Sequence, residues 1–108
     1  ARPTGIFGGF SVRMAGADAS EEALLRMTRD QLQAATNLVR PDHDSYEFHI
    51  TLAYNLRWFS ARDADAIIAL SDEVGAELVA RVPRIALGPV EFCTFDAMDH
   101  FERRHWID

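Results

Sequence analysis

The chain has 108 residues, of which 48% are hydrophobic and 26% charged, and its net charge is −6. This length fits a single domain that buries about two-thirds of the surface exposed by the unfolded chain. The acidic balance excludes a broad nucleic-acid or membrane surface, because no general excess of positive charge attracts phosphate, although a small basic pocket remains possible.

Other features of the sequence bear on location. No apolar run approaches the ~20 residues that a membrane-spanning helix needs. No basic, apolar-cored leader opens the sequence, and the single cysteine excludes an intramolecular disulfide framework. We therefore expect a cytoplasmic protein that does not enter a membrane.

The first part of the chain predicts a loop followed by a strand. Residues 2–5 have a loop-like composition, and residues 6–14 then alternate apolar and polar side chains in their second half, as a strand does. Gly8 and Gly9 lie inside this segment. A glycine pair weakens a strand and often marks a bulge, or a close approach by another backbone or a ligand.

A long helix is predicted from about residue 20 to residue 39. Asp18 and Ser20 are both suitable N-caps, and two glutamates occupy the first turn, where the helix dipole favours anions. An apolar stripe at helical spacing is expected to pack in the core. The stripe consists of Leu24, Leu25, Thr28, Leu32, Ala35 and Leu38.

The central feature of the sequence is residues 46–55, which alternate without exception. One face of the predicted strand is apolar, and His49 and Thr51 lie together on the other face. An imidazole and a hydroxyl on one rigid strand can transfer a proton and donate a hydrogen bond to the same ligand oxygen. Polar faces with such residues are also common without any function, so the pattern alone leaves both interpretations open.

The preceding loop, residues 40–45, contains His43 between two aspartates. We interpret His43 as a surface-loop histidine, with a ligand-binding role as the alternative.

A second helix is predicted for residues 61–81, with Ser60 as its N-cap. Its apolar side is expected to consist of Ala66, Ile67, Leu70, Val74, Leu78 and Val82. Strands follow at residues 84–87 and 90–95, and the tail is either a hairpin arm or a short helix. Cys93, within the last of these strands, is interpreted as a buried inert thiol; a nucleophilic cysteine is the alternative.

This order of elements predicts an α+β fold, in which two helices pack on one face of an antiparallel-rich sheet. The other face, carrying His49 and Thr51, is expected to be open to solvent or a ligand.

A longer pattern surrounds the His-x-Thr pair. The run FHITL at residues 48–52 resembles the signature of the 2H phosphoesterase superfamily. The resemblance extends over RPDH at 40–43, the strand through residue 54, Arg57-Trp58, FGGF at 7–10 and EFCTFD at 91–96. Over nearly its whole length the chain is thus similar to the C-terminal half of an uncharacterised bacterial and fungal branch of that superfamily.

The resemblance implies two similar lobes, each contributing one His-x-Ser/Thr strand to a shared cleft. It also implies hydrolysis of a phosphodiester, often cyclic, in a small molecule or an RNA end, with one His as base and the other as acid. No metal or other cofactor is expected. Carried over, His49 belongs to the acid/base pair and Thr51 donates to a phosphate oxygen, while Arg57 and His43 are candidate substrate-binding residues.

The sequence departs from this pattern because it contains one such motif. His43 is too close to His49 to form a second lobe, and neither His100 nor His105 is followed by a hydroxyl two positions later. Three arrangements remain open. The N-terminal lobe of the same protein supplies the second motif, a second copy of the chain supplies it, or the lobe is a non-catalytic binding or oligomerisation module.

Overall fold

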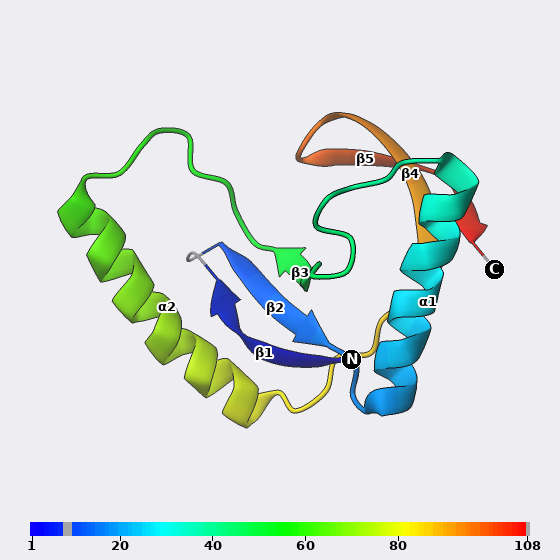
Figure 1. The fold of residues 1–108 in the computed structure, drawn as a ribbon. Helices are drawn as coiled ribbons and strands as arrows, with labels where there is room; N and C mark the ends of the chain where they lie inside the picture. Colours follow the sequence, from blue (N-terminus) through cyan, green and yellow to red (C-terminus); the bar gives the residue numbers. More distant parts are fainter. Residues whose placement is uncertain (8–9, 108) are drawn as a thin grey trace.

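A computed structural model describes residues 1–7 and 10–107 of the chain, and Figure 1 shows an α+β fold, as predicted. The described residues form two helices and two antiparallel sheets. The first sheet has the order β1-β2-β3, and the second is the hairpin β4–β5. The elements are β1 (Arg2–Phe7), β2 (Ser11–Ala15), α1 (Ala19–Thr36), β3 (Phe48–Thr51), α2 (Ala61–Arg81), β4 (Val90–Ala97) and β5 (His100–Ile107).

The three-stranded sheet has one apolar face, which holds the core of this part of the chain. Val12 pairs with Ile50 and Met14 with Phe48 across β2 and β3, so the four side chains lie on the same face. Val12 and Met14 are buried. Leu78 of α2 packs against this cluster. The core therefore forms where α2 meets the sheet.

Helix α2 has the predicted bounds and the predicted Ser60 N-cap, whose hydroxyl accepts a hydrogen bond from the Asp63 N–H. Its buried positions are Ser71 and Gly75. Small side chains at these two positions let the helix approach β1 closely.

The predicted apolar stripe of α2 is therefore partly wrong. Leu70 and Val74, expected in the core, are 60% and 42% exposed. Leu78 does contact the core. Hydrophobic periodicity alone did not identify the side of α2 that packs against the sheet, because the contact with β1 is made at the smallest residues.

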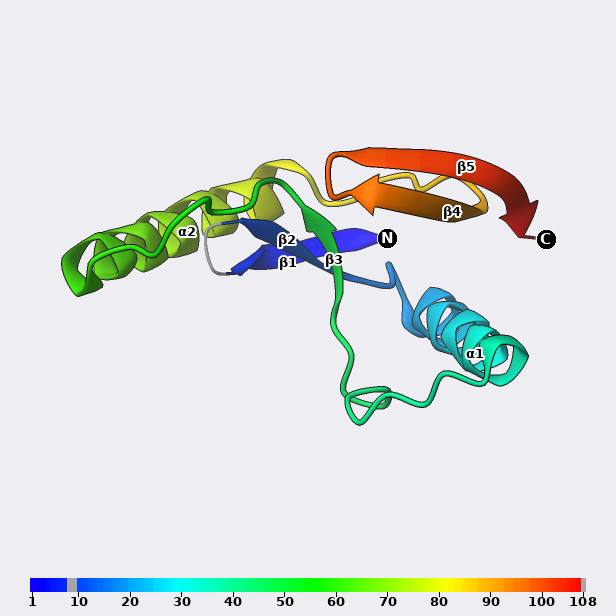
Figure 2. The ribbon, with the colours of Figure 1, turned by 90° about the horizontal axis from the view of Figure 1, so that it is seen from above.

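Helix α1 has Asp18 as its N-cap, one of the two predicted candidates, and ends at Asn37, which adopts a left-handed conformation with φ 54°. It is thus shorter than predicted. None of its residues is buried, so the predicted core packing of its apolar stripe is not found; Leu24, for example, is 54% exposed. Figures 1 and 2 show α1 past the end of the sheet, away from α2. Polar contacts attach it instead, among them the bond from the Gly16 N–H to the Glu22 carboxylate at 2.7 Å.

Several strand boundaries also differ from the prediction. Residues 2–5, predicted as a loop, belong to β1, which pairs with β2 and contains a bulge between Pro3 and Gly5. Residues 84–87 form no strand, and the tail forms β5. The predicted bulge or close approach at Gly8 and Gly9 lies outside the described residues.

The central strand is paired over four residues, 48–51, and not over all ten. Its partner β2 is short and offers the residues 11–14 for pairing. Beyond Thr51 the chain turns to another acceptor, and the N–H groups of Leu52 and Ala53 both donate to the Phe10 carbonyl.

The hairpin β4–β5 forms a sheet of its own, seen apart from the first sheet in Figure 2. It presents large apolar side chains to solvent, with Phe95 58% and Phe101 53% exposed. An isolated two-stranded hairpin is marginally stable in water.

Among the described residues, no helix combines the length and the apolar character needed to cross a membrane.

Candidate functional site on the polar face of β2 and β3

The β2–β3 pairing surrounds His49 and Thr51 with two further polar residues. Arg13 lies directly opposite His49, and Ser11 lies directly opposite Thr51. Directly opposed residues of an antiparallel pair project from the same face, with Cβ atoms about 4.5–5.5 Å apart. We refer to Ser11, Arg13, His49 and Thr51 as the polar patch. It lies on the face of the sheet opposite the core, and His49 and Thr51 are both exposed, as expected for an open face.

The imidazole of His49 is held in a defined orientation. Its Nδ1 lies 3.0 Å from the backbone carbonyl oxygen of Glu47. With the proton on Nδ1, this nitrogen donates to the carbonyl and Nε2 keeps a lone pair that can accept a proton. The ring also packs against Tyr46, at 5.9 Å between centroids and an interplanar angle of 44°. The arrangement suits a general base or, once protonated, a general acid.

Arg13 brings a positive charge to the patch. Its Nε lies 3.0 Å from a carboxylate oxygen of Glu47. In the alternating segment, Glu47 lies on the same face as His49 and Thr51. The side chains of Arg13 and Glu47 are 43% and 58% exposed. Both side chains therefore reach solvent, although the Arg13 Nε atom itself is buried.

A depression of about 310 Å³ adjoins the patch. Its lining combines one imidazole, one guanidinium, hydroxyl groups and two carboxylates, and consists of Ser11, Arg13, Asp42, Ser45, Tyr46, Glu47 and His49. Thr51 lies at the end of β3, outside this lining. The depression can thus receive a polar ligand next to the His49 ring.

Helix α1 fixes one wall of this depression through two arginines. Arg26 donates from Nη1 to the Tyr46 carbonyl oxygen at 2.6 Å, and its guanidinium lies over the Phe48 ring at 4.8 Å from the ring centre. The Arg29 guanidinium lies 3.6 Å from the centre of the Tyr46 ring. Stacking of this kind stabilises both groups. The segment leading into β3 is therefore oriented by α1.

The two other predicted substrate-binding residues lie elsewhere. His43 Nε2 is 2.7 Å from the Asp30 carboxylate of α1, and this contact joins the loop to the helix. Arg57 lies in the segment after β3, where its neighbours Leu56 and Trp58 are 101% and 95% exposed. Neither residue lines the depression beside His49. Their roles in binding remain predictions.

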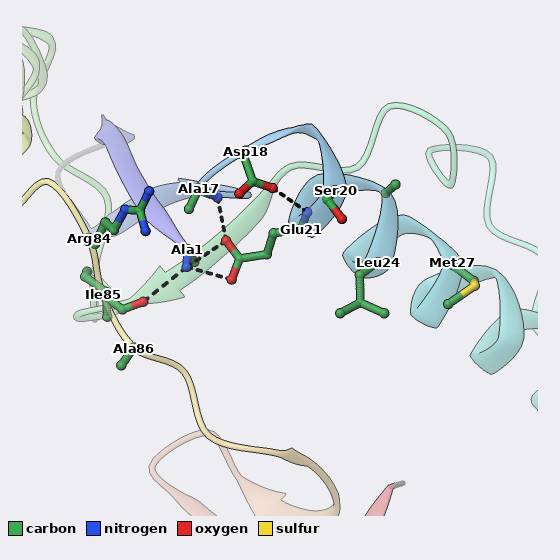
Figure 3. A pocket seen from close by; sticks show the side chains of 11 residues that line it. Ala1, Ala17, Asp18, Ser20, Glu21, Leu24, Met27, Arg84, Ile85 and Ala86 are labelled. Carbon is green, nitrogen blue, oxygen red and sulfur yellow. Dashed lines mark hydrogen bonds and ion pairs between the residues drawn. The ribbon is translucent and has the colours of Figure 1, made fainter.

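A larger depression, of about 750 Å³, lies between the start of α1, the start of β1 and residues 84–86. Figure 3 shows Glu21 at its centre, where the carboxylate accepts hydrogen bonds from the Ala17 N–H and from the Ala1 ammonium at 2.9 Å. The bond from Ala17 and the contact with the ammonium hold the pKa of Glu21 below its usual value. Because the Ala17 N–H already engages the Glu21 carboxylate, this depression is a weaker candidate for acid–base chemistry.

Cys93, on β4, is partly buried rather than fully buried. Desolvation raises the pKa of its thiol, and the nearby Glu91 carboxylate raises it further. A raised pKa lowers the fraction of thiolate, which is the nucleophilic form. This agrees with an unreactive thiol.

The part of the chain that the structure describes contains no cluster of three or more His, Cys, Asp or Glu side chains arranged to hold a metal ion.

Sequence reasoning did not identify Ser11 and Arg13 as site residues. The alternation in residues 10–14 had placed both on the polar side of their strand. What the sequence did not indicate is the pairing of β2 with β3, two strands separated by a helix and a loop. The register that sets Arg13 against His49 appears in the structure alone.

The chain matches no family model and no curated protein. It does match a crystal structure, that of a conserved protein of unknown function from Agrobacterium tumefaciens, with a TM-score of 0.81 and 33% sequence identity. The match covers 100% of this chain and 47% of the Agrobacterium protein. The chain therefore spans about half the length of that protein and shares its fold over this half.

Proposed function

We propose that the chain is one lobe of a metal-independent phosphodiesterase of the 2H type, acting on a cyclic or linear phosphodiester in a small molecule or an RNA end. The observation that carries this proposal is the polar patch. His49 and Thr51 lie side by side on an exposed sheet face, next to a guanidinium and a second hydroxyl. These are the groups that proton transfer and phosphate binding need.

The roles of the two residues follow from their chemistry. His49 Nε2 takes a proton from the attacking hydroxyl or water, or returns one to the leaving oxygen, while Nδ1 is held by the Glu47 carbonyl. The hydroxyl of Thr51 donates to a non-bridging phosphate oxygen and stabilises its charge. A complete site needs a second histidine, because deprotonation and protonation occur on opposite sides of the phosphorus.

A second lobe is the natural source of that histidine. The Agrobacterium protein has more than half of its chain outside the match. In this chain, no residue of α1 is buried, and the aromatic side chains of β4 and β5 are exposed. Exposed apolar surfaces of this kind usually mark interfaces. Both observations support a companion lobe, whether it belongs to the same polypeptide or to a second copy of the chain.

The proposal is tested by incubating the full-length protein with a panel of 2′,3′-cyclic nucleotides, linear dinucleotides and bis(4-nitrophenyl) phosphate in the presence of EDTA. We expect hydrolysis of at least one diester class that EDTA does not inhibit. Hydrolysis that depends on an added divalent cation, or none above the rate with heat-denatured protein, contradicts the proposal.

The second candidate function is a binding or oligomerisation module that keeps the fold without chemistry. The exposed hairpin favours it, with the Phe95 and Phe101 rings tilted against each other at 5.0 Å between ring centres. Sedimentation equilibrium at micromolar concentration then gives a dimer or larger species, and Phe101→Asp shifts it towards monomer. A wild-type chain that sediments as a monomer counts against this candidate.

A further inference from the structure

The His-x-Thr motif assigns no role to one residue of the polar patch, Arg13. Arg13 lies on β2, outside the motif, yet it is directly opposite His49 and lines the same depression. A guanidinium at this position is close enough to a group bound at His49 to contact it. It forms an ion pair with the Glu47 carboxylate at 3.0 Å.

We propose that Arg13 is the anion-binding residue of the polar patch, and that a phosphate group seated beside His49 replaces the Glu47 carboxylate as its partner. This inference rests on the proposed function and deepens it. Arg13 binds the phosphate, Ser11 and Thr51 flank it with hydroxyl donors, and His49 lies next to the oxygen that gains or loses a proton.

The exchange is favoured because the existing ion pair is weak. Both side chains are about half exposed, and solvated ion pairs contribute little to stability. A phosphodiester offers two non-bridging oxygens to the planar guanidinium fork, which can then donate two parallel N–H bonds. Glu47, once released, returns to water at small cost.

The neighbouring arginines are engaged in structural contacts. Arg26 is bonded to the Glu22 carboxylate at 3.1 Å and to the Tyr46 carbonyl, and Arg29 stacks on the Tyr46 ring. Moving either arginine onto a ligand would loosen α1 from the segment before β3. Arg13, by contrast, lines the depression beside His49 while Arg26 and Arg29 do not, which makes it the arginine suited to a ligand there.

Glu47 gives the proposal its distinguishing feature. If the carboxylate competes with phosphate for Arg13, removing its charge strengthens anion binding, and it does so through Arg13 alone. A purely structural ion pair predicts the opposite, because loss of either partner would then loosen the β2–β3 pair and weaken binding.

The test measures the Kd of inorganic phosphate for the full-length protein from the NMR shift of the His49 imidazole. We expect Arg13→Gln to weaken binding roughly tenfold or more, as loss of a charged hydrogen bond does. Glu47→Gln should tighten it roughly threefold, and the double variant should bind as weakly as Arg13→Gln alone. Arg13→Lys should recover part of the affinity.

Arg81→Gln is the matched control, because Arg81 forms an exposed ion pair with Glu77 at 2.6 Å on α2 and should leave the Kd unchanged. Wild-type affinity in folded Arg13→Gln, or weaker binding in Glu47→Gln, overturns the proposal. If Arg13→Gln does not fold by circular dichroism, Arg13→Lys and Glu47→Gln decide the question in its place. Since no turnover is measured, a protein that binds phosphate through Arg13 but hydrolyses no diester refutes the proposed function and not this inference.

Discussion

Gly75 of α2 lies directly against the backbone of Ile6 in β1. A Cβ atom added at Gly75 would be 2.7 Å from the Ile6 nitrogen, closer than side chains approach a backbone. This contact brings the helix onto the sheet whose other face carries the polar patch. The close approach explains why the α2–sheet contact is centred on a glycine.

Gly75→Ala tests this contact. In an open helical position the change would stabilise the protein by about 1 kcal/mol, because alanine is the better helix former. Here we expect overpacking to outweigh that gain and to lower the free energy of unfolding by about 1–2 kcal/mol, measured by urea denaturation. Gly88→Ala is the control, since nothing lies within 4 Å of its added Cβ. A more stable Gly75→Ala variant would refute the close contact.

Glu22 makes the attachment of α1 sensitive to acid. The hydrogen bond from the Gly16 N–H, with help from Arg26, holds the pKa of Glu22 below its ordinary value of 4.5. When the pKa of a carboxyl group is lower in the folded state than in the unfolded state, its ionisation stabilises the fold at a pH above the unfolded-state pKa. This stabilisation is lost as the pH falls through the folded-state pKa. The free energy of unfolding should therefore decrease as the pH is lowered below about 4.5.

Glu22→Gln should flatten this acid dependence and lower stability at pH 7 by roughly 1 kcal/mol or less, because the amide accepts the Gly16 hydrogen bond more weakly. Chemical denaturation between pH 3 and 7 provides the measurement. Glu77→Gln, on the solvent side of α2, should leave the slope unchanged. An equal slope in wild type and Glu22→Gln would show that the Gly16 contact carries no pH dependence.

Cys93 should react slowly with thiol reagents. Because its pKa is raised, less thiolate is present at pH 7–8 than in an ordinary cysteine. We expect labelling by an aromatic disulfide to be slower than that of free cysteine and to rise with pH. Glu91→Gln removes the adjacent carboxylate and should accelerate labelling several-fold. Fast labelling at pH 7 in the wild type would instead indicate an activated thiol.

The sequence predicted the elements better than their packing. Capping residues are local signals, so Ser60 located the start of α2, and Asp18, one of two candidates, proved to be the N-cap of α1. The apolar stripes indicated that both segments are helices, but not which elements the helices contact. Leu24 of α1 matches a core position by periodicity and is nevertheless exposed, because no other element among the described residues covers it.

For the candidate site, the period of two placed His49 and Thr51 on one face, and the structure agrees. Ser11 and Arg13 required the register between two strands far apart in sequence, which local pattern does not encode. His43 shows a similar limit. Its neighbours in sequence are aspartates, but its contact in the fold is Asp30, from the preceding helix.

We expect the Thr51 hydroxyl to bind phosphate and not to stabilise the fold, because Thr51 is exposed at the end of β3. Thr51→Val keeps the shape and removes the donor. It should lower kcat/KM for the diester identified in the substrate panel by roughly 10²-fold, with Thr51→Ser near wild type. An unchanged kcat/KM in Thr51→Val would show that the hydroxyl takes no part in the mechanism.

The most direct test of the account is the rate of diester hydrolysis by the full-length protein carrying His49→Ala, with circular dichroism to confirm its fold. His49 is exposed and contributes nothing to the core, so the variant should fold normally. Loss of a general acid or base predicts a fall in kcat of roughly 10²- to 10⁴-fold. A folded His49→Ala protein that hydrolyses the diester at the wild-type rate would contradict the account, because the polar patch would then take no part in the chemistry.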